Sequence, residues 1–183
     1  EPGQEHKATI ASEARAAAGG GITTLVCPPD TDPVIDEPAV VELIRRRARA
    51  AGQVRVLTLG ALTHRLHGER LAEMAALKEA GCVGVGDGGR TVASSRVLRR
   101  ALEYAATFDL TVFLTPLDPE LGHGLAHEGQ VATRFGLPGI PVAAETGVIA
   151  RDLELIRDLG VRVHFGRLSS ARAVELVARA QAE

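Results

Sequence analysis

Short apolar runs alternate with longer amphipathic stretches along the whole chain of 183 residues. The apolar runs are rich in β-branched residues and mostly lack polar alternation, which is typical of strands that are buried on both faces. The predicted strands are residues 22–27, 54–59, 83–85, 110–114 and 161–165.

The stretches between these runs have the apolar spacing and the boundary residues of helices. Glycine, a common helix stop, follows several of them, and Ser94, Ser95 and Ser170 stand where a side chain can cap a first turn. The predicted helices are residues 6–18, 38–51, 69–80, 97–108, 143–159 and 171–182.

Strands that alternate with helices at this spacing indicate parallel βαβ units in a single domain over residues 1–183. Periodicity alone leaves a doubly wound sheet and a (β/α)₈ barrel open. No Gly-x-Gly-x-x-Gly follows a strand, which disfavours the dinucleotide-binding alternative. The loops at residues 30–36 and 118–127 follow strand ends, where α/β folds place their sites.

Composition excludes several classes of partner. The net charge is −2 and aromatic residues make up 3% of the chain, so we expect no nucleic-acid surface. No apolar run reaches the roughly 18 residues that a membrane span requires, so we expect no membrane partner. Cys27 and Cys82 lie at the ends of apolar runs, which favours buried free thiols and a cytoplasmic location over a disulfide.

The six histidines offer no obvious metal site. His64 with His67 and His123 with His127 are the only close pairs, and neither has a Glu between its histidines, as a zinc-protease helix would. We expect both pairs in loops or at the surface. His164 lies within an apolar strand, which favours a core histidine.

Asp87 is the carboxylate with the most suggestive position, in the strand-end sequence Gly86-Asp87-Gly88-Gly89. It could bind a metal or a substrate amine, but a loop-shaping Asx turn is the favoured interpretation. Cys27 has no neighbouring general base. The residues alone therefore indicate an α/β chain without a catalytic constellation.

Short motifs in a fixed order run along nearly the whole chain. They are EPGQEHK (1–7), RAAAGGGITT (15–24), CPPDTDPVID (27–36), GALT (60–63), LAEM (71–74), LKEAG (77–81), RALEYA (100–105), GLPGIP (136–141) with AE (144–145), and ARD (150–152). Together they resemble class I dihydroorotases of the amidohydrolase superfamily. The resemblance implies a TIM-type (β/α)₈ barrel of the metal-dependent hydrolase kind. The chain would hold about strands 2 to 6 with their helices, as a fragment of a longer chain with two unpaired sheet edges.

The chain departs from the family at the positions that bind metal in active relatives. The second Asp of Ser-Asp-Asp-Gly is Gly88 here, the His that ends strand 5 is Thr115, and the His that ends strand 6 is Arg167. Gly has no donor atom, Thr is a weak ligand and Arg does not deprotonate. Asp30 replaces the substrate-binding Asn of Met-Pro-Asn-Thr and should repel a carboxylate substrate such as dihydroorotate. Asp30 and Asp87 thus remain as degenerate substrate-binding positions.

The resemblance implies a non-catalytic dihydroorotase-like subunit of pyrimidine biosynthesis. Similar inactive homologues assemble with the aspartate carbamoyltransferase catalytic chain and support it, so we expect a hetero- or homo-oligomer, no catalytic residue and no cofactor, whereas active relatives use zinc. The alternative is an active metal-dependent cyclic amidohydrolase, converting N-carbamoyl-aspartate to dihydroorotate, with ligands outside this chain. A third hypothesis is a small-molecule sensor that uses Arg167 and Asp87 in the old cleft.

Overall fold

A five-stranded parallel sheet forms the centre of the computed structural model, which describes residues 2–183. Neighbouring strands pair in parallel in the order β1-β2-β3-β4-β7. The strands are β1 (Thr24–Cys27), β2 (Arg55–Ala61), β3 (Gly84–Gly86), β4 (Thr111–Leu114) and β7 (Val163–Phe165). All five lie within or overlap the predicted strands.

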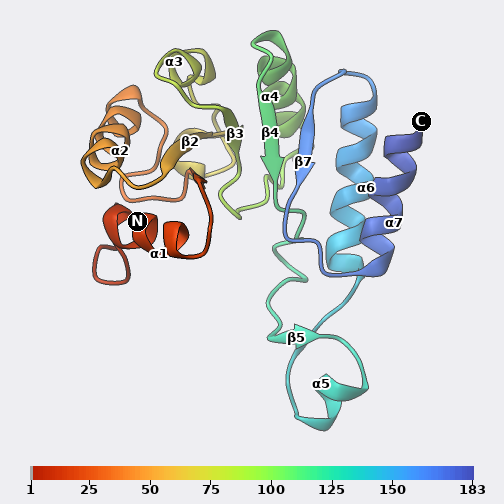
Figure 1. Cartoon of the computed structure of the whole chain (residues 1–183). Coiled ribbons are helices and arrows are strands. Elements are labelled where there is room, and N and C mark those ends of the chain that lie inside the picture. Colours follow the sequence, from red (N-terminus) through yellow and green to blue (C-terminus); the bar gives the residue numbers. More distant parts are fainter. Residues whose placement is uncertain (1) are drawn as a thin grey trace.

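Helices connect successive strands and lie around the outside of the sheet in chain order (Figure 1). Helix α1 packs on α2, α2 on β2, α4 on α6, and α6 on α7. Their bounds are α1 (Ile10–Gly19), α2 (Pro38–Ala51), α3 (Met74–Glu79), α4 (Ser95–Thr107), α6 (Ala143–Arg157) and α7 (Ala171–Ala182), with a short 3-10 helix η1 (His64–Leu66) after β2.

Two helices start later than the sequence predicts. Helix α1 begins at Ile10 because Thr9 forms a reciprocal capping box with Ser12, not at residue 6. Helix α3 begins at Met74, not at residue 69, because Leu71 forms an antiparallel bridge with Thr63. The predicted caps of α4 and α7 are confirmed: the Ser94 and Ser170 hydroxyls each accept the backbone N–H three residues on.

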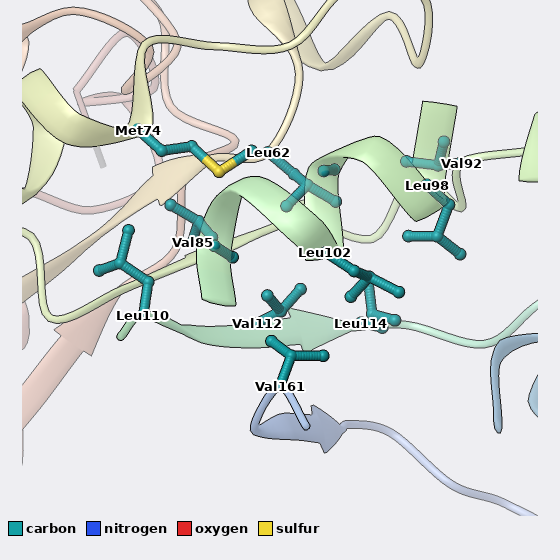
Figure 2. Close-up of a cluster of buried hydrophobic side chains, with 12 residues drawn as sticks. Leu62, Met74, Val85, Val92, Leu98, Leu102, Leu110, Val112, Leu114 and Val161 are labelled. Carbon is teal, nitrogen blue, oxygen red and sulfur yellow. The ribbon is translucent and has the colours of Figure 1, made fainter. Parts of the chain in front are cut away.

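The core lies between the sheet and its helices in two clusters. Figure 2 shows the larger one, in which side chains of α4 such as Leu98 and Leu102 meet Val85 of β3 and Val112 and Leu114 of β4. The smaller cluster lies under α2 and α3 and includes buried Cys82. Neither cysteine forms a disulfide within residues 2–183, as expected, but only Cys82 is buried and Cys27 is partly exposed.

Residues between β4 and α6 form an excursion with its own small elements. Strands β5 (Ala126–His127) and β6 (Gly139–Ile140) pair in parallel around α5 (Gln130–Arg134). Figure 1 shows this excursion projecting from the end of the sheet at which β4 finishes. The sequence indicates only a loop here, because two-residue strands are too short to show periodicity.

The sheet is part of a barrel. Five consecutive parallel strands with crossover helices on one side give a partial (β/α) barrel, as the resemblance implies. Strands β1 and β7 are its two edges within residues 2–183, and neither has a further partner strand there. No helix of residues 2–183 is long and apolar enough to cross a membrane.

Candidate functional site

The carboxyl ends of the strands meet at one edge of the sheet, where barrel enzymes place their chemistry. A cleft of about 160 Å³ lies there. It is lined by Pro28 and Pro29 after β1, Asp87 to Gly89 after β3, Thr115 after β4 and Arg167 after β7. Residues from the loops after four of the five parallel strands therefore share one site.

The three positions at which the family resemblance implies metal ligands all line this cleft. Gly88, Thr115 and Arg167 converge there although they are far apart in the sequence. Zinc takes thiolate, imidazole or carboxylate donors, and these positions offer no side chain, a hydroxyl and a guanidinium. Within residues 2–183 no group of three or more His, Cys, Asp or Glu side chains is placed to hold a metal. The residues at these three positions do not form a ligand set that fits zinc.

The backbone at Gly88 also disfavours a larger residue. Its φ is +62°, in the left-handed region that favours glycine. A Cβ atom there would lie 2.8 Å from Cδ1 of Leu66 and 3.1 Å from Cβ of Asp30. A side chain at position 88 therefore requires both a strained backbone and movement of buried Leu66.

Asp87 shapes the loops rather than facing the cleft with a free carboxylate. It is 3% exposed; Oδ1 accepts the N–H of Gly89 at 2.8 Å, and Oδ2 accepts the N–H of Thr115 at 2.7 Å. Burial raises the pKa of this carboxyl, while the hydrogen bonds from Thr115 and Gly89 and the charge of Arg167 act in the opposite direction. The turn interpretation is confirmed, and the same side chain ties the β3 loop to the end of β4.

Asp30 lies beside Gly88, behind the same turn. Its Oδ1 atom is buried and has no hydrogen-bond partner. An unpaired buried carboxylate oxygen is costly, and the family's Asn would bring a neutral amide to the same place. The role of Asp30 as a degenerate substrate-binding position stays a prediction.

Arg167 carries an unpaired charge at the mouth of the site. Its φ is +60°, and its exposed guanidinium forms no hydrogen bond or ion pair within residues 2–183. Nη1 lies 2.9 Å from where a Cβ on Gly89 would be, so the side chain passes over a glycine that leaves room for it. Arg167 therefore brings a permanent positive charge to the cleft.

The histidines fall where the sequence predicts, with one exception. His67, His123 and His127 are exposed, and half-buried His64 contacts Asp36 through Nδ1 at 2.9 Å. The prediction of a core histidine at His164 is wrong. Strand alternation turns its side chain away from the outer helices, where it is exposed beside the ring of Phe113 at 5.1 Å and lines the cleft.

A larger cavity of about 350 Å³ adjoins the cleft, and Gly89, Thr115 and Arg167 line both. The excursion between β4 and α6 forms one wall, and the β7–α7 loop forms another. In its floor, buried Glu145 of α6 accepts the backbone N–H groups of Ser169 at 2.7 Å and Ser170 at 3.0 Å. Their hydroxyls also donate to this carboxylate.

Sequence analysis missed Glu145 and a second buried acid, Asp152. Asp152 is 2% exposed and pairs with Arg151 at 2.7 Å, and Arg151 also donates to the carbonyl of Ala93 at 3.0 Å. Burial raises the pKa of Asp152 to about 6; Arg151 lowers it, and Asp87 raises it further. Both acids lie in the motifs AE and ARD. The groups that surround them, such as Ser169 and Ala93, are distant in the sequence, so the sequence did not show that these acids are buried and paired.

Parallel strands with a cleft at their carboxyl ends define a (β/α) barrel, and solved structures share this fold. The L-hydantoinase of Arthrobacter aurescens superposes with a TM-score of 0.73 at 22% identity, covering 95% of this chain and 40% of its own. The dihydroorotase of Saccharomyces cerevisiae gives a TM-score of 0.69 at 13% identity, over 95% of this chain and 47% of its own.

A family model described as dihydro-orotase-like matches residues 1–173, and the chain belongs to this family. A dihydroorotase-like protein of Pseudomonas aeruginosa is 56% identical over 183 residues, which are 100% of this chain and 43% of that protein. A dihydroorotase of Syntrophobacter fumaroxidans is 48% identical over 182 residues, 99% of this chain and 42% of that protein. The chain therefore spans less than half the length of these relatives.

Proposed function

We propose that this chain is part of a non-catalytic dihydroorotase homologue of pyrimidine biosynthesis, which assembles with the aspartate carbamoyltransferase catalytic chain and supports it. The observation that carries the non-catalytic part is the convergence of Gly88, Thr115 and Arg167 in one cleft. The partner is carried by the resemblance to inactive homologues that assemble in this way. A place in this pathway implies the cytoplasm.

The chemistry of ring opening explains why these residues matter. Bulk water is too weak an acid to supply hydroxide at neutral pH, and a bound metal ion lowers its pKa to about 7. Gly88 gives such an ion no donor atom, and the Thr115 hydroxyl is a weak ligand. The Arg167 guanidinium stays protonated and repels a cation. We therefore propose that the protein uses no zinc at these positions.

The alternative of an active cyclic amidohydrolase faces two obstacles in this chain. The three family positions supply no ligand, so a complete set would need ligands from outside residues 2–183. The metal would also have to sit beside the Arg167 guanidinium. The names of the relatives point both ways: the two Pseudomonas proteins are called dihydroorotase-like, at 56% and 53% identity, and others at 48% or less are called dihydroorotase.

Co-purification tests the proposed partnership directly. The full-length protein containing this chain is co-expressed with the carbamoyltransferase chain of the same organism, and the complex is isolated through a tag on the first. We expect co-elution in a fixed ratio, and carbamoyltransferase activity that is lower when the partner is expressed alone. A chelator should leave the complex intact, because no metal holds it together.

The matched control is Thr115→Ala, which removes the weak donor in the cleft and should leave the complex unchanged. The proposal is wrong if the carbamoyltransferase chain assembles and is fully active alone. It is also wrong if the chelator dissociates the complex.

A further inference from the structure

The cavity next to Arg167 has the size and walls of a small-molecule site. Its volume of about 350 Å³ falls in the range of ligand pockets, roughly 300–1,000 Å³. Leu117 lines it from the start of the excursion, and Ile140 and Pro141 line it from the end. These side chains are apolar, and Arg167 faces them from the β7–α7 loop.

The carboxylates near this cavity are hydrogen-bonded to other groups and form no ion pair with Arg167. Glu145 also lines it, but both of its oxygens already accept hydrogen bonds from Ser169 and Ser170. Asp87 lies nearby with both oxygens bound to backbone N–H groups. Within residues 2–183 the Arg167 guanidinium has no hydrogen-bond or ion-pair partner, so its donors are free toward the cavity.

Two local features mark the position of Arg167. Arg167 keeps a left-handed backbone, with φ +60°, which is unfavourable for a residue with a Cβ atom. Its Nη1 atom passes over Gly89, where a Cβ would lie at only 2.9 Å. Strained backbone that persists in a structure is a reason to look for a function at that position.

The amino-terminal end of α6 lines the same cavity. Val142, the residue before this 15-residue helix, lines the cavity and makes no side-chain cap. The positive end of a helix favours an anion. A dianion such as phosphate is disfavoured because Arg167 is the only permanently charged cation lining the cavity, while Glu145 lies in its floor. A planar carboxylate matches one guanidinium with two parallel hydrogen bonds.

We propose that this cavity binds a small carboxylate whose negative charge is held by Arg167 and whose apolar body lies against Leu117 and Ile140. This goes beyond the proposed assembly function, because it gives the old catalytic edge a ligand of its own. The Arg that displaces a metal ligand becomes the residue that holds an anion. Asp87, in contrast to the sensor hypothesis, is occupied by its turn and does not contact the ligand.

Calorimetric titration of the full-length protein tests this site without any turnover assay. The titrants are succinate, benzoate and N-carbamoyl-L-aspartate, with inorganic phosphate for comparison. We expect at least one carboxylate to bind once per chain and more tightly than phosphate. Arg167→Gln should weaken it about tenfold or more, as loss of a charge-assisted hydrogen bond does.

Arg172→Gln is the matched control, because Arg172 is exposed on α7 and does not line the cavity; it should bind as the parent does. Arg167→Lys keeps the charge without the bidentate geometry, so it should bind at an intermediate strength.

Circular dichroism establishes that each variant is folded. If Arg167→Gln is not folded, the loss of affinity measured for Arg167→Lys decides. The proposal is overturned if none of the three carboxylates binds, if phosphate binds more tightly, or if the Arg167 variants bind as tightly as the parent. Failure to bind because another part of the protein pairs with Arg167 also counts against it.

Discussion

At Gly88 the local backbone itself opposes a carboxylate side chain. Gly88→Asp would place a Cβ 2.8 Å from Cδ1 of Leu66 in a left-handed conformation. We expect it to lower the free energy of unfolding by about 2–4 kcal/mol, from backbone strain and overpacking together. Urea unfolding measures this.

Gly68→Asp is the matched control, because φ is +74° but nothing lies within 4 Å of a Cβ there. It should cost only the backbone strain, about 1–2 kcal/mol. Equal losses at positions 68 and 88 would show that Leu66 and Asp30 do not close the ligand position.

Asp152 gives a pH dependence with a defined sign. Its pKa is about 6 in the folded chain and about 3.9 in an unfolded one. The folded chain therefore binds this proton more tightly, and the stability contributed by the group is present below about pH 4 and is lost as the pH rises through about 6. Relative to Asp152→Asn, the free energy of unfolding of the parent should fall by at most about 3 kcal/mol over this range. Urea unfolding of both proteins at several pH values measures it; a difference that does not change with pH would contradict the assignment.

Single residues were predictable where the family motif marks them. Gly88, Thr115 and Arg167 could be named from the order of motifs, and the turn at Asp87 from its glycine neighbours. His164 was placed wrongly, because an apolar strand does not show which of its faces the helices cover. No sequence pattern could pair Glu145 with Ser169, since that contact depends on the packing of α6 against α7.

Helices α6 and α7 are joined by a buried carboxylate, which gives a prediction at the scale of elements. Glu145 accepts two backbone N–H groups before α7. In Glu145→Gln one of these N–H groups would face an amide donor, so the free energy of unfolding should drop by about 1–3 kcal/mol.

Glu154→Gln on the same helix is the control, because Glu154 is exposed and pairs only with Arg157 at the surface. That change should cost less than about 1 kcal/mol. Thermal or urea unfolding of the two variants decides; the same loss from both would mean that Glu145 does not clamp the helices.

The regular elements followed from the sequence more closely than the irregular ones. Strands with apolar runs and helices with serine caps were placed within a few residues, because burial and capping leave local patterns. The start of α3 was misplaced because a bridge between Thr63 and Leu71 competes with the helix. The excursion with β5, α5 and β6 was missed because its elements are too short to be periodic.

At the scale of the whole molecule, the open edges of the sheet set the expected behaviour of this chain alone. Strands β1 and β7 have unpaired sides within residues 2–183, and exposed strand edges promote association. Expressed in isolation, residues 1–183 should self-associate and melt at a lower temperature than the full-length protein. Light scattering after size exclusion and a thermal melt measure both properties. A monomer as stable as the full-length protein would show that the partial barrel needs no further strands.

The central claim is that the metal chemistry of the family has been lost at Gly88, Thr115 and Arg167. The most direct measurement is the zinc content of the full-length protein, taken together with its rate of dihydroorotate ring opening in the presence of added zinc. The account predicts no stoichiometric zinc and no turnover above the uncatalysed rate. Stoichiometric bound zinc together with turnover would contradict it.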